Sequence, residues 1–380
     1  MNISVITLSL TKVNKGKTYS LQDEGLAKEL IGRGHDVTIH RFVADGQSSE
    51  DGMIRYHKVR HLGNNSIPEV SVLDEKADAI ICFSDISIFT YKIADFADAN
   101  NIIFIPYVGV LTSKSTNAII RNLMNIVAGR TISLYKNRTV LAKTEKVKDE
   151  LLSHGVSDVR VANIGIDFSR LNKDYVKKND ICTVLMVGRL EEDRTPMGAA
   201  DIIGNIYSRT TDVRFIIVGD GSLKMSIFDK IKEKTGQDVI ACSLEDIDKA
   251  GPGIYSIPKV PNDLMYKVYE FSDFYINLNV NEIFGMSLLE AMYYENVPYA
   301  IHAPGPDDII DEGVCGFLFD SIERMAEALG GDVTDYINGN GSHDRTQEMK
   351  KKAHDRIINS FTWEGTGDII EELLDKNSEK

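Results

Sequence analysis

Cysteine is scarce in this 380-residue sequence, which contains only four, and tryptophan occurs once. Cys82, Cys182, Cys242 and Cys315 lie far apart among apolar neighbours, and no two of them form a Cys-x-x-Cys pair. This spacing excludes a disulfide scaffold and favours neither a zinc site nor a redox pair. We expect four buried free thiols in a reducing compartment.

Long hydrophobic runs and an N-terminal signal pattern are lacking as well. The longest nearly unbroken apolar run, residues 102–111, is far shorter than the roughly 20 residues that a transmembrane helix needs. No basic run precedes an apolar stretch at the N-terminus, so we expect no signal peptide. The predicted location is the cytoplasm, with peripheral contact to a membrane left open.

Basic residues are also fewer than acidic residues. The chain has 43 Lys and Arg against 57 Asp and Glu, a formal net charge of −14. This balance argues against a broad basic face for nucleic acid. The charge is uneven, because residues 1–170 carry 21 basic and 19 acidic residues whereas the rest carry 22 and 38. We therefore expect the two halves to have different surroundings.

Short β-branched apolar runs alternate with helical patterns along the chain. In the first half, strands are expected at 3–10, 36–42, 79–83 and 102–107, and helices at 21–31 and 88–99. The alternation falters in a polar stretch at 166–180. It then resumes with strands at 183–187, 213–218, 254–257, 274–278 and 297–301, and helices at 197–207 and 223–234. This pattern predicts an α/β fold of two doubly wound, Rossmann-like domains with parallel sheets.

The strongest motif is the segment 281–292, Asn-Glu-Ile-Phe-Gly-Met-Ser-Leu-Leu-Glu-Ala-Met, which follows an expected strand and opens a helix. Gly285 would let backbone approach a ligand closely, and the first amides of the helix would point at an anion. Glu290 could accept hydrogen bonds from two neighbouring hydroxyls, as on a ribose, and Glu282 could bind a sugar. The alternative is an ordinary amphipathic helix with two surface glutamates.

A second motif follows the strand at 183–187. Gly188 and Arg189 end this strand, and Arg194 comes after the acidic run 191–193. Ligands of open α/β sheets lie outside the carboxyl ends of strands, and the guanidinium fork matches phosphate oxygens. These arginines could therefore clamp a diphosphate. A loop held by local ion pairs to residues 191–193 is the alternative.

Together these motifs resemble the GT-B-fold glycosyltransferases, most of all family 4, which is retaining and uses nucleotide sugars. The resemblance covers most of residues 160–370. Its carrying segments are 164–167 (Ile-Gly-Ile-Asp), 187–190 (Val-Gly-Arg-Leu), 218–221 (Val-Gly-Asp-Gly), 309–318, and Glu282 to Glu290 with Phe284-Gly285. The resemblance implies two Rossmann-like domains facing each other across a cleft. Residues 1–170 would form the acceptor side and 171–360 the nucleotide-sugar domain, with a C-terminal helix in 361–380 crossing back.

The resemblance also implies individual roles. The catalytic set would be Glu282, Arg189 and Arg194, with the arginines holding the donor diphosphate. Glu290 would bind the ribose. The full donor site would comprise Gly188, Arg189, Arg194, Ile257, Lys259, Glu282, Phe284, Gly285, Met286, Ser287 and Glu290, with 257–259 beside the base. Neither a cofactor nor a metal is implied, because the arginines and a helix dipole would neutralise the diphosphate.

The first half departs from the family pattern at two loops. The glycine-rich loop after the first strand is replaced by residues 11–17, where Gly16 and Lys17 would contact phosphate or acceptor; exposed loop lysines are the alternative. The family often has a His in the region of Tyr107, but this segment contains none. Tyr107 itself is a further candidate for a loop that meets phosphate or acceptor. His302 is the one histidine expected at a cleft edge.

The resemblance, together with these motifs, implies a metal-independent, retaining hexosyltransferase that moves a sugar from a nucleotide sugar, with a UDP-sugar preferred, to an acceptor hydroxyl on a glycan, lipid or protein. An epimerase or hydrolase of nucleotide sugars and a non-catalytic subunit that binds an acceptor or partner protein stay open. Residues 114–148 hold eight Lys and Arg, and apolar residues at 118–127 have helical spacing. That pattern fits either contact with an anionic membrane or a helix packed on the core.

Overall fold

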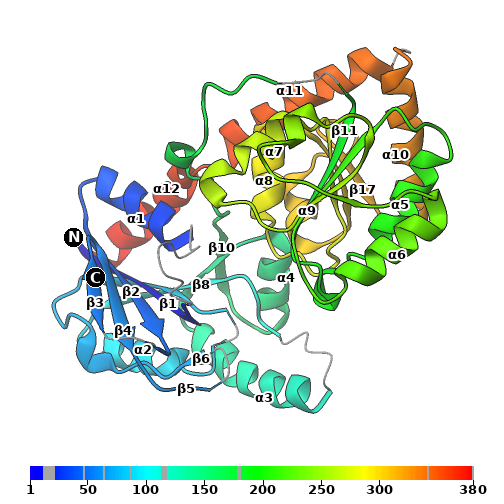
Figure 1. The fold of residues 1–380 in the computed structure, drawn as a ribbon. Coiled ribbons are helices and arrows are strands. Elements are labelled where there is room, and N and C mark those ends of the chain that lie inside the picture. The colour runs from blue at the N-terminus through cyan, green and yellow to red at the C-terminus, as the bar shows by residue number, and fades with distance from the viewer. Residues whose placement is uncertain are drawn as a thin grey trace. The chain divides into compact units, whose positions relative to one another are not determined.

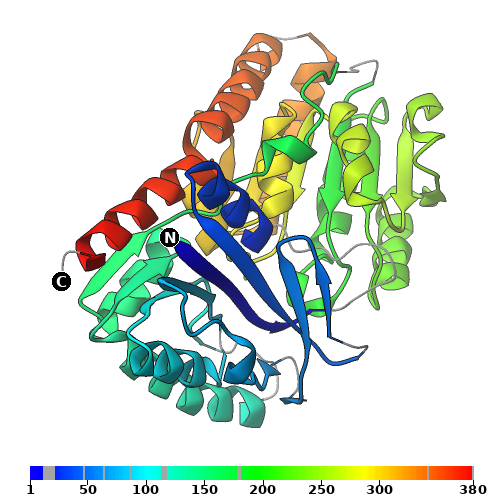
Figure 2. The ribbon, with the colours of Figure 1, turned by 90° about the vertical axis from the view of Figure 1, so that its left-hand side faces the viewer.

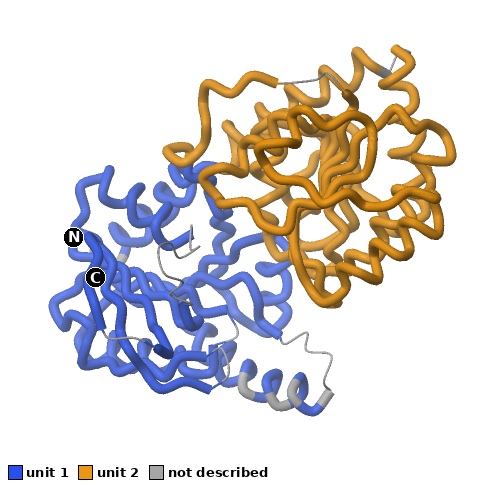
Figure 3. Tube along the Cα trace, viewed as in Figure 1, with its two compact units in different colours: residues 1–167, 362–380 blue, residues 168–361 orange. Residues whose placement is uncertain are grey.

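The computed structural model describes residues 1–11, 22–45, 48–62, 65–85, 87–112, 118–177, 181–339 and 342–378. The chain divides into two compact units (Figure 3). Unit 1 consists of residues 1–167 with 362–380, and unit 2 of residues 168–361. Each unit has its own, largely parallel sheet with helices packed against it (Figure 1). The predicted α/β class with two doubly wound, Rossmann-like units is therefore confirmed.

The sheet of unit 1 is centred on strand β1 (Asn2–Leu10), which pairs in parallel with β2 (Asp36–Val43) and β7 (Ala79–Phe83). Its other strands are β3 (Ser49–Asp51), β4 (Ile54–Lys58), β5 (His61–Leu62), β6 (Asn65–Ser66), β8 (Ile103–Val108), β9 (Thr139–Ala142) and β10 (Asp158–Val161). The main order is β10-β9-β8-β7-β1-β2-β4-β3. The chain moves outward from β1 on one side and then returns to its other side, so the topological switch point lies between β1 and β7.

The helices of unit 1 include one from the far end of the chain. They are α1 (Gln22–Gly32), α2 (Thr90–Ala99), α3 (Ala118–Tyr135), α4 (Glu145–Ser153), α12 (Trp363–Ser378) and the 3₁₀ turn η1 (Val70–Val72). Figure 2 shows α12, in red, beside α1, in blue. Two glycines permit this packing, since a Cβ on Gly25 would lie 2.1 Å from the indole nitrogen of Trp363 and one on Gly165 2.2 Å from its backbone nitrogen. Arg33, directly after α1, also donates to Asp368 on α12 at 2.8 Å.

The sheet of unit 2 is entirely parallel, with the order β13-β14-β12-β11-β15-β16-β17. The strands are β11 (Thr183–Val187), β12 (Arg214–Val218), β13 (Ile240–Ala241), β14 (Gly253–Ile257), β15 (Phe274–Asn277), β16 (Val297–Ile301) and β17 (Phe317–Phe319). The helices are α5 (Gly198–Tyr207), α6 (Lys224–Thr235), α7 (Tyr266–Glu270), α8 (Met286–Tyr293), α9 (Pro304–Ile309), α10 (Ile322–Ile337) and α11 (Ser342–Ser360). The described part of this unit also has the 3₁₀ turns η2 (Phe168–Arg170), η3 (Glu192–Arg194), η4 (Ile247–Lys249) and η5 (Asn262–Leu264). The switch point lies between β11 and β15.

Buried strands explain why the sequence pattern was informative. The strands β7, β12 and β16 are buried at every residue, as expected for parallel strands covered on both faces. The cysteines need one correction: three are buried, but Cys242 is only half-buried, because it follows the short edge strand β13. Within the part of the chain that the structure describes, none of the helices is long and apolar enough to cross a bilayer.

Candidate active site

The loops that follow β11 and β15 meet at the switch point of unit 2. Arg194 ends the turn η3 after β11, and its Nη1 donates to Oε2 of Glu282 in the loop after β15, at 3.2 Å. The next residue, Thr195, adopts a left-handed conformation with φ of 50°. Its hydroxyl donates to the carbonyl of Leu278, which joins the same two loops. The sequence predicted Arg194 and Glu282 for one site, and the fold brings their side chains together.

Neighbouring residues fix the orientation of Glu282. Its Oε2 also accepts a hydrogen bond from Nδ2 of Asn279 at 3.0 Å. Its backbone amide donates to the carbonyl of Asn279, and its carbonyl accepts from the amide of Gly305, each at 3.0 Å. The Glu282 side chain is 18% exposed and that of Arg194 is 38% exposed. The pair is thus ordered by the protein and remains within reach of a ligand.

Helix α8 begins directly after this loop. Gly285 precedes it with φ of 90°, a conformation that L side chains rarely adopt, and its carbonyl accepts from the amides of Leu288 and Leu289 at 2.9 and 3.1 Å. The amides of Met286 and Ser287 come before the first bonds of the helix. Such first-turn amides, together with the helix dipole, favour a bound anion. The turn therefore suits a phosphate beside the Arg194–Glu282 pair.

The loop after β12 contacts the loop after β11 closely through backbone atoms, and Ser222 also donates to the Glu191 carboxylate through its amide, at 3.0 Å, and through its hydroxyl. The amide of Gly188 donates to the carbonyl of Val218 at 3.0 Å. A Cβ on Gly219, whose φ is 149°, would lie 1.8 Å from the Gly188 carbonyl oxygen. A side chain at position 219 would push these loops apart. The Gly-Asp-Gly segment at 219–221 thus has a packing reason that is independent of any ligand.

Arg189 differs from Arg194 in its surroundings. Its side chain is 59% exposed, and its Nη2 donates to Asp193 at 2.7 Å. This is the local ion pair that the sequence left open as the alternative. Exposed pairs of this kind contribute at most about 1 kcal/mol, so a phosphate could compete for the guanidinium.

Glu290 lies on α8 with a tyrosine as partner. Its Oε2 accepts a hydrogen bond from the hydroxyl of Tyr269 on α7 at 2.9 Å. Burial raises the pKa of Glu290 to about 7, and the tyrosine bond opposes that rise only in part. One turn earlier on the same helix, the hydroxyl of Ser287 bonds that of Tyr275 from β15 at 2.8 Å. Glu290 therefore has an ordered polar neighbour, which the alternative of an ordinary amphipathic helix with two surface glutamates did not include.

The remaining candidates of unit 2 lie at the same edge of the sheet or next to it. Ile257 ends β14 with its side chain buried, and its carbonyl accepts from the amide of Gly219 at 3.0 Å. Lys259 is exposed, and the Phe284 side chain is buried. His302 follows β16 and lies 2.7 Å from Asp307 through Nδ1. No structural contact joins His302 to the Arg194–Glu282 pair among the described interactions.

The candidates in unit 1 have a different outcome. Tyr107 is fully buried, and its hydroxyl donates to the carbonyl of Ala162 at 2.6 Å, so it is a core residue rather than a loop residue that meets an acceptor. The expectation for its side chain was wrong, because Tyr107 lies within β8 and its side chain is buried in the core of unit 1. Gly16 and Lys17 lie outside the described residues.

Sequence reasoning missed the residues that hold the site in place. Asn277 accepts from the amide of Asn279, and Asn279 accepts from the amide of Asn281, both through Oδ1 at 3.0 Å. The alternating asparagines at 277, 279 and 281 were a usable signal, because Asn side chains often close such turns. Tyr269 gave no signal, since it lies 21 residues from Glu290.

No group of three or more His, Cys, Asp or Glu that could hold a metal ion occurs among the described residues.

Comparison with known proteins shows the family and the fold to which this chain is similar. The profile of the family "Glycosyl transferases group 1" matches residues 167–356, half of the chain. Among curated proteins, alpha-monoglucosyldiacylglycerol synthase of Acholeplasma laidlawii is 23% identical over 208 residues, which are 53% of this chain and 46% of that protein. The match thus spans about half the length of this relative.

Solved structures extend the similarity over the whole chain at the level of the fold. Sucrose-phosphate synthase from Thermosynechococcus elongatus has a TM-score of 0.69 at 14% identity, and the similarity covers 99% of this chain and 98% of the synthase chain. HepE of Anabaena, solved with UDP and glucose, has a TM-score of 0.66 at 14% identity, with coverage of 98% and 99%. TarM of S. aureus, solved with UDP and other ligands, has a TM-score of 0.69 at 12% identity, with coverage of 98% and 100%. The resemblance to GT-B glycosyltransferases is confirmed, and this chain belongs to the family Glycosyl transferases group 1.

Proposed function

We propose that this chain is a retaining glycosyltransferase that transfers a hexose from a UDP-sugar to an acceptor hydroxyl. The observation that carries the proposal is the Arg194–Glu282 pair beside the N-terminus of α8, at the switch point of unit 2. Arginine and first-turn amides together supply the positive potential that a diphosphate needs. The HepE and TarM structures were solved with UDP, which supports uracil as the base.

Each residue of the site has a role in this proposal. Arg194, joined by Arg189, stabilises the charge that grows on the departing diphosphate, with the amides of Met286 and Ser287 beside it. Glu282 accepts hydrogen bonds from the transferred sugar. Glu290 accepts from the ribose, and residues 257–259 lie beside the base. The cationic groups are the chain's own, so the proposed reaction uses no divalent metal.

The acceptor in this proposal is the hydroxyl of a lipid. The name of the Acholeplasma relative supports it, since monoglucosyldiacylglycerol is a lipid that carries one glucose. Helix α3 supports it as well, because Ile119 and Ile126 are 79% and 70% exposed, seven residues apart and hence on one face. We assign residues 1–170 to the acceptor side and 171–360 to the donor side, which is the arrangement expected of a peripheral enzyme.

Calorimetry with UDP, UDP-glucose and GDP, in buffer that contains a chelator, tests the donor assignment. We expect UDP to bind the parent protein, and Arg194→Ala to weaken binding at least tenfold, or about 1.4 kcal/mol. The matched control is Arg209→Ala, which removes an equally paired arginine, 2.6 Å from Glu327. Equal UDP affinity in the parent and Arg194→Ala, or binding that appears only when manganese replaces the chelator, would contradict the proposal. The anomeric configuration of the product, read by NMR, tests retention.

A further inference from the structure

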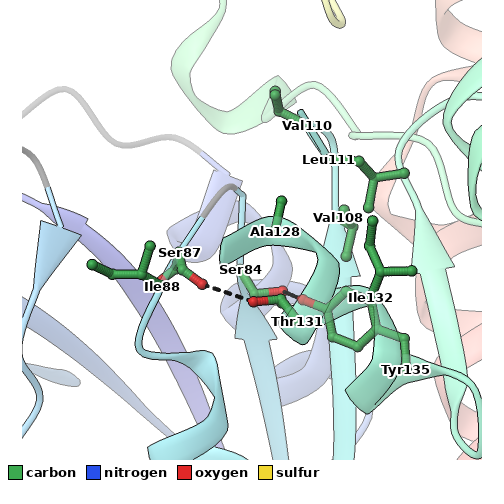
Figure 4. Close-up of a pocket in the computed structure, with 10 residues that line it drawn as sticks. All are labelled: Ser84, Ser87, Ile88, Val108, Val110, Leu111, Ala128, Thr131, Ile132 and Tyr135. Carbon is green, nitrogen blue, oxygen red and sulfur yellow. Dashed lines mark hydrogen bonds between the residues drawn. The ribbon is translucent and has the colours of Figure 1, made fainter. Parts of the chain in front are cut away.

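The pocket beside helix α3 in unit 1 is too small to hold a substrate. It lies between α3 and the loops that follow β7 and β8, and a hydrogen bond of 2.7 Å joins the hydroxyls of Ser84 and Tyr135, two of its lining residues (Figure 4). Its volume of about 10 Å³ has room for about one water molecule. The feature with a further role lies instead in unit 2, directly after Arg194.

Thr195 has a backbone conformation that its side chain disfavours. It ends the turn η3 with φ of 50° and ψ of 39°, in the left-handed region. Residues branched at Cβ rarely adopt this conformation, and Pro196 adds a constraint, because a residue before proline favours an extended backbone. Asn101 and Glu295 also have positive φ, but neither is branched at Cβ. Among the described residues, Thr195 is thus the one Cβ-branched residue in the left-handed region.

Two hydrogen bonds hold this turn. The amide of Thr195 donates to the carbonyl of Glu192 at 3.1 Å, which closes the turn η3. The hydroxyl of Thr195 donates to the carbonyl of Leu278, one residue beyond β15. Leu278 is buried, so this carbonyl belongs to a fixed part of unit 2. Backbone strain of this kind persists only where the surrounding structure imposes it, and such strain is concentrated at functional sites.

The bond from Thr195 to Leu278 lies next to the Arg194–Glu282 pair on both chain segments. Thr195 follows Arg194 directly, and Leu278 precedes Asn279, whose Nδ2 donates to Oε2 of Glu282 at 3.0 Å. The same Oε2 accepts from Arg194 at 3.2 Å. The loops after β11 and β15 are therefore joined twice, once through Thr195 and once through Arg194. The Thr195 bond fixes the separation of the loops at the place where the Arg194 bond forms.

The ion pair with Glu282 alone would hold Arg194 loosely. The Arg194 side chain is 38% exposed, and ion pairs near water order two long side chains only weakly. An arginine that is ordered only when its ligand binds loses affinity, because its side-chain entropy is then lost on binding. A fixed backbone at the next residue reduces that loss before the ligand arrives.

We propose that Thr195 is a positioning residue for the donor and acts through Arg194. Its left-handed backbone directs the guanidinium of Arg194 toward Glu282, and its hydroxyl bond to Leu278 keeps the turn in that conformation. The donor's diphosphate thus meets an arginine that is already oriented. The inference rests on the proposed function and deepens it, because it names a residue that sets the affinity for the diphosphate without contacting it.

Three substitutions separate the hydroxyl from the backbone. Thr195→Ser keeps the hydroxyl, Thr195→Ala removes it but keeps a Cβ, and Thr195→Gly removes both the hydroxyl and the strain. In thermal unfolding, Thr195→Gly should melt at least about 2 °C above Thr195→Ala, because glycine adopts the left-handed conformation freely. In calorimetry with UDP, Thr195→Ser should bind within twofold of the parent, and the other two variants at least fivefold more weakly.

These measurements distinguish positioning from a purely structural role. UDP affinity should follow the hydroxyl, whereas the melting temperatures of the Ala and Gly variants should follow the strain. Parent-like UDP affinity in both of these variants would show that Thr195 serves only the fold and would overturn the inference. A loss in Thr195→Ser as large as in Thr195→Ala would overturn the role of the hydroxyl. The matched control is Thr235→Ala, which removes a hydroxyl that donates to Ile231 at 2.8 Å and should bind UDP like the parent.

A combination with Arg194→Ala tests whether Thr195 acts through Arg194. Once the guanidinium is absent, Thr195→Ala should weaken UDP binding by less than a further twofold, because residues that act as one unit are not additive. Additive losses in the double variant would overturn the route through Arg194. A parent that binds UDP while its Thr195 variants bind equally well overturns this inference alone. A parent that binds no UDP overturns the proposed function itself, and this inference with it.

Discussion

At the scale of single residues, Glu290 sits where ligand binding and stability oppose each other. Burial raises its pKa to about 7 from an ordinary value of 4.5, because the ionised form loses hydration. A carboxyl group with a raised pKa stabilises the fold fully below its unfolded pKa, and that contribution is lost as the pH rises through 7. In the role proposed for Glu290, the ionised carboxylate is the better acceptor of hydrogen bonds from ribose hydroxyls. The proposed role therefore needs the ionisation state that destabilises unit 2.

Glu290→Gln should separate the two effects. Glutamine does not titrate, yet its carbonyl oxygen can still accept from the Tyr269 hydroxyl. We expect the variant to melt at least about 2 °C above the parent at pH 8 and close to it at pH 5, and to bind UDP more weakly at pH 8. Thermal unfolding at both pH values and calorimetry measure this. A lower melting temperature at pH 8 would show that the ionised carboxylate is stabilising instead.

Residue positions could be predicted from the sequence where chemistry and spacing are local. Arg194, Glu282 and Gly285 lie in loops that follow strands located by the apolar pattern. Because ligands of open α/β sheets bind beyond the carboxyl ends of strands, the sequence predicted these residues for the site. The ion pair between Asp85 and Lys143 was not predicted, because the two residues lie 58 positions apart in the sequence. Such pairs form only when particular strands become neighbours in the sheet, and no single sequence motif predicts the order of the strands.

At the scale of elements, the pairing of β2 with β4 brings the buried His40 against the half-buried His57 in unit 1. Nδ1 of His40 lies 3.0 Å from Nε2 of His57, and the two rings stack at 5.2 Å. Burial, the neighbouring His57 and Arg55 together lower the pKa of His40 to about 4, with Asp74 opposing the shift. Because the unfolded chain binds a proton near pH 6.5, the folded pair loses stability as the pH falls from 6.5 to 4.

His40→Phe should reduce this sensitivity to acid. Phenylalanine can stack on His57 but takes up no proton, so the drop in stability between pH 7.5 and 5 should be smaller than in the parent. Hydrogen exchange of the β2 amides reads the effect locally, within unit 1. His61→Phe, at an exposed position on β5, is the control and should keep the parental slope. If stability falls equally between pH 7.5 and 5 in the parent and both variants, His40 does not cause the sensitivity to acid.

Elements were predictable where burial imposes a pattern. The long central strands begin and end within two residues of their expected bounds, because each is a short apolar run between polar loops. The edge strand β3 is exposed at every residue, and the two-residue β5 is exposed as well, so neither leaves an apolar signal. They form through pairing with a neighbour, which the sequence pattern does not display.

At the scale of the whole molecule, the charge of a compact unit differs from that of a sequence half. Residues 1–170 alone are slightly basic, but α12 belongs to unit 1 and is acidic. Unit 1 therefore has 22 Lys and Arg against 25 Asp and Glu, and unit 2 has 21 against 32. Attraction to an anionic membrane cannot come from the charge of unit 1 as a whole. The predicted contact with an anionic membrane therefore rests on the basic residues concentrated at 114–148.

Helix α3 is the part of unit 1 best suited to such local contact. Its exposed Ile119 and Ile126 share a face with the exposed Arg130, and Lys136 follows just beyond the helix. Each basic residue near an anionic surface contributes about 1 kcal/mol and is screened by salt, and each isoleucine adds roughly 1.5–3 kcal/mol when its side chain leaves water. These contributions together predict weak, reversible binding that needs both anionic lipid and the two isoleucines.

Co-sedimentation with vesicles tests this prediction. We expect the parent to sediment with phosphatidylglycerol vesicles at low salt, to be released by added salt, and not to sediment with phosphatidylcholine. Ile119→Gln with Ile126→Gln should weaken binding at least tenfold, because both side chains lose their transfer from water to lipid. Ile240→Gln removes a comparably exposed isoleucine from unit 2 and should bind like the parent. If the double variant binds vesicles like the parent, the membrane contact does not lie on α3. If the parent sediments with neither kind of vesicle at low salt, the protein does not reach a lipid acceptor by binding the membrane surface.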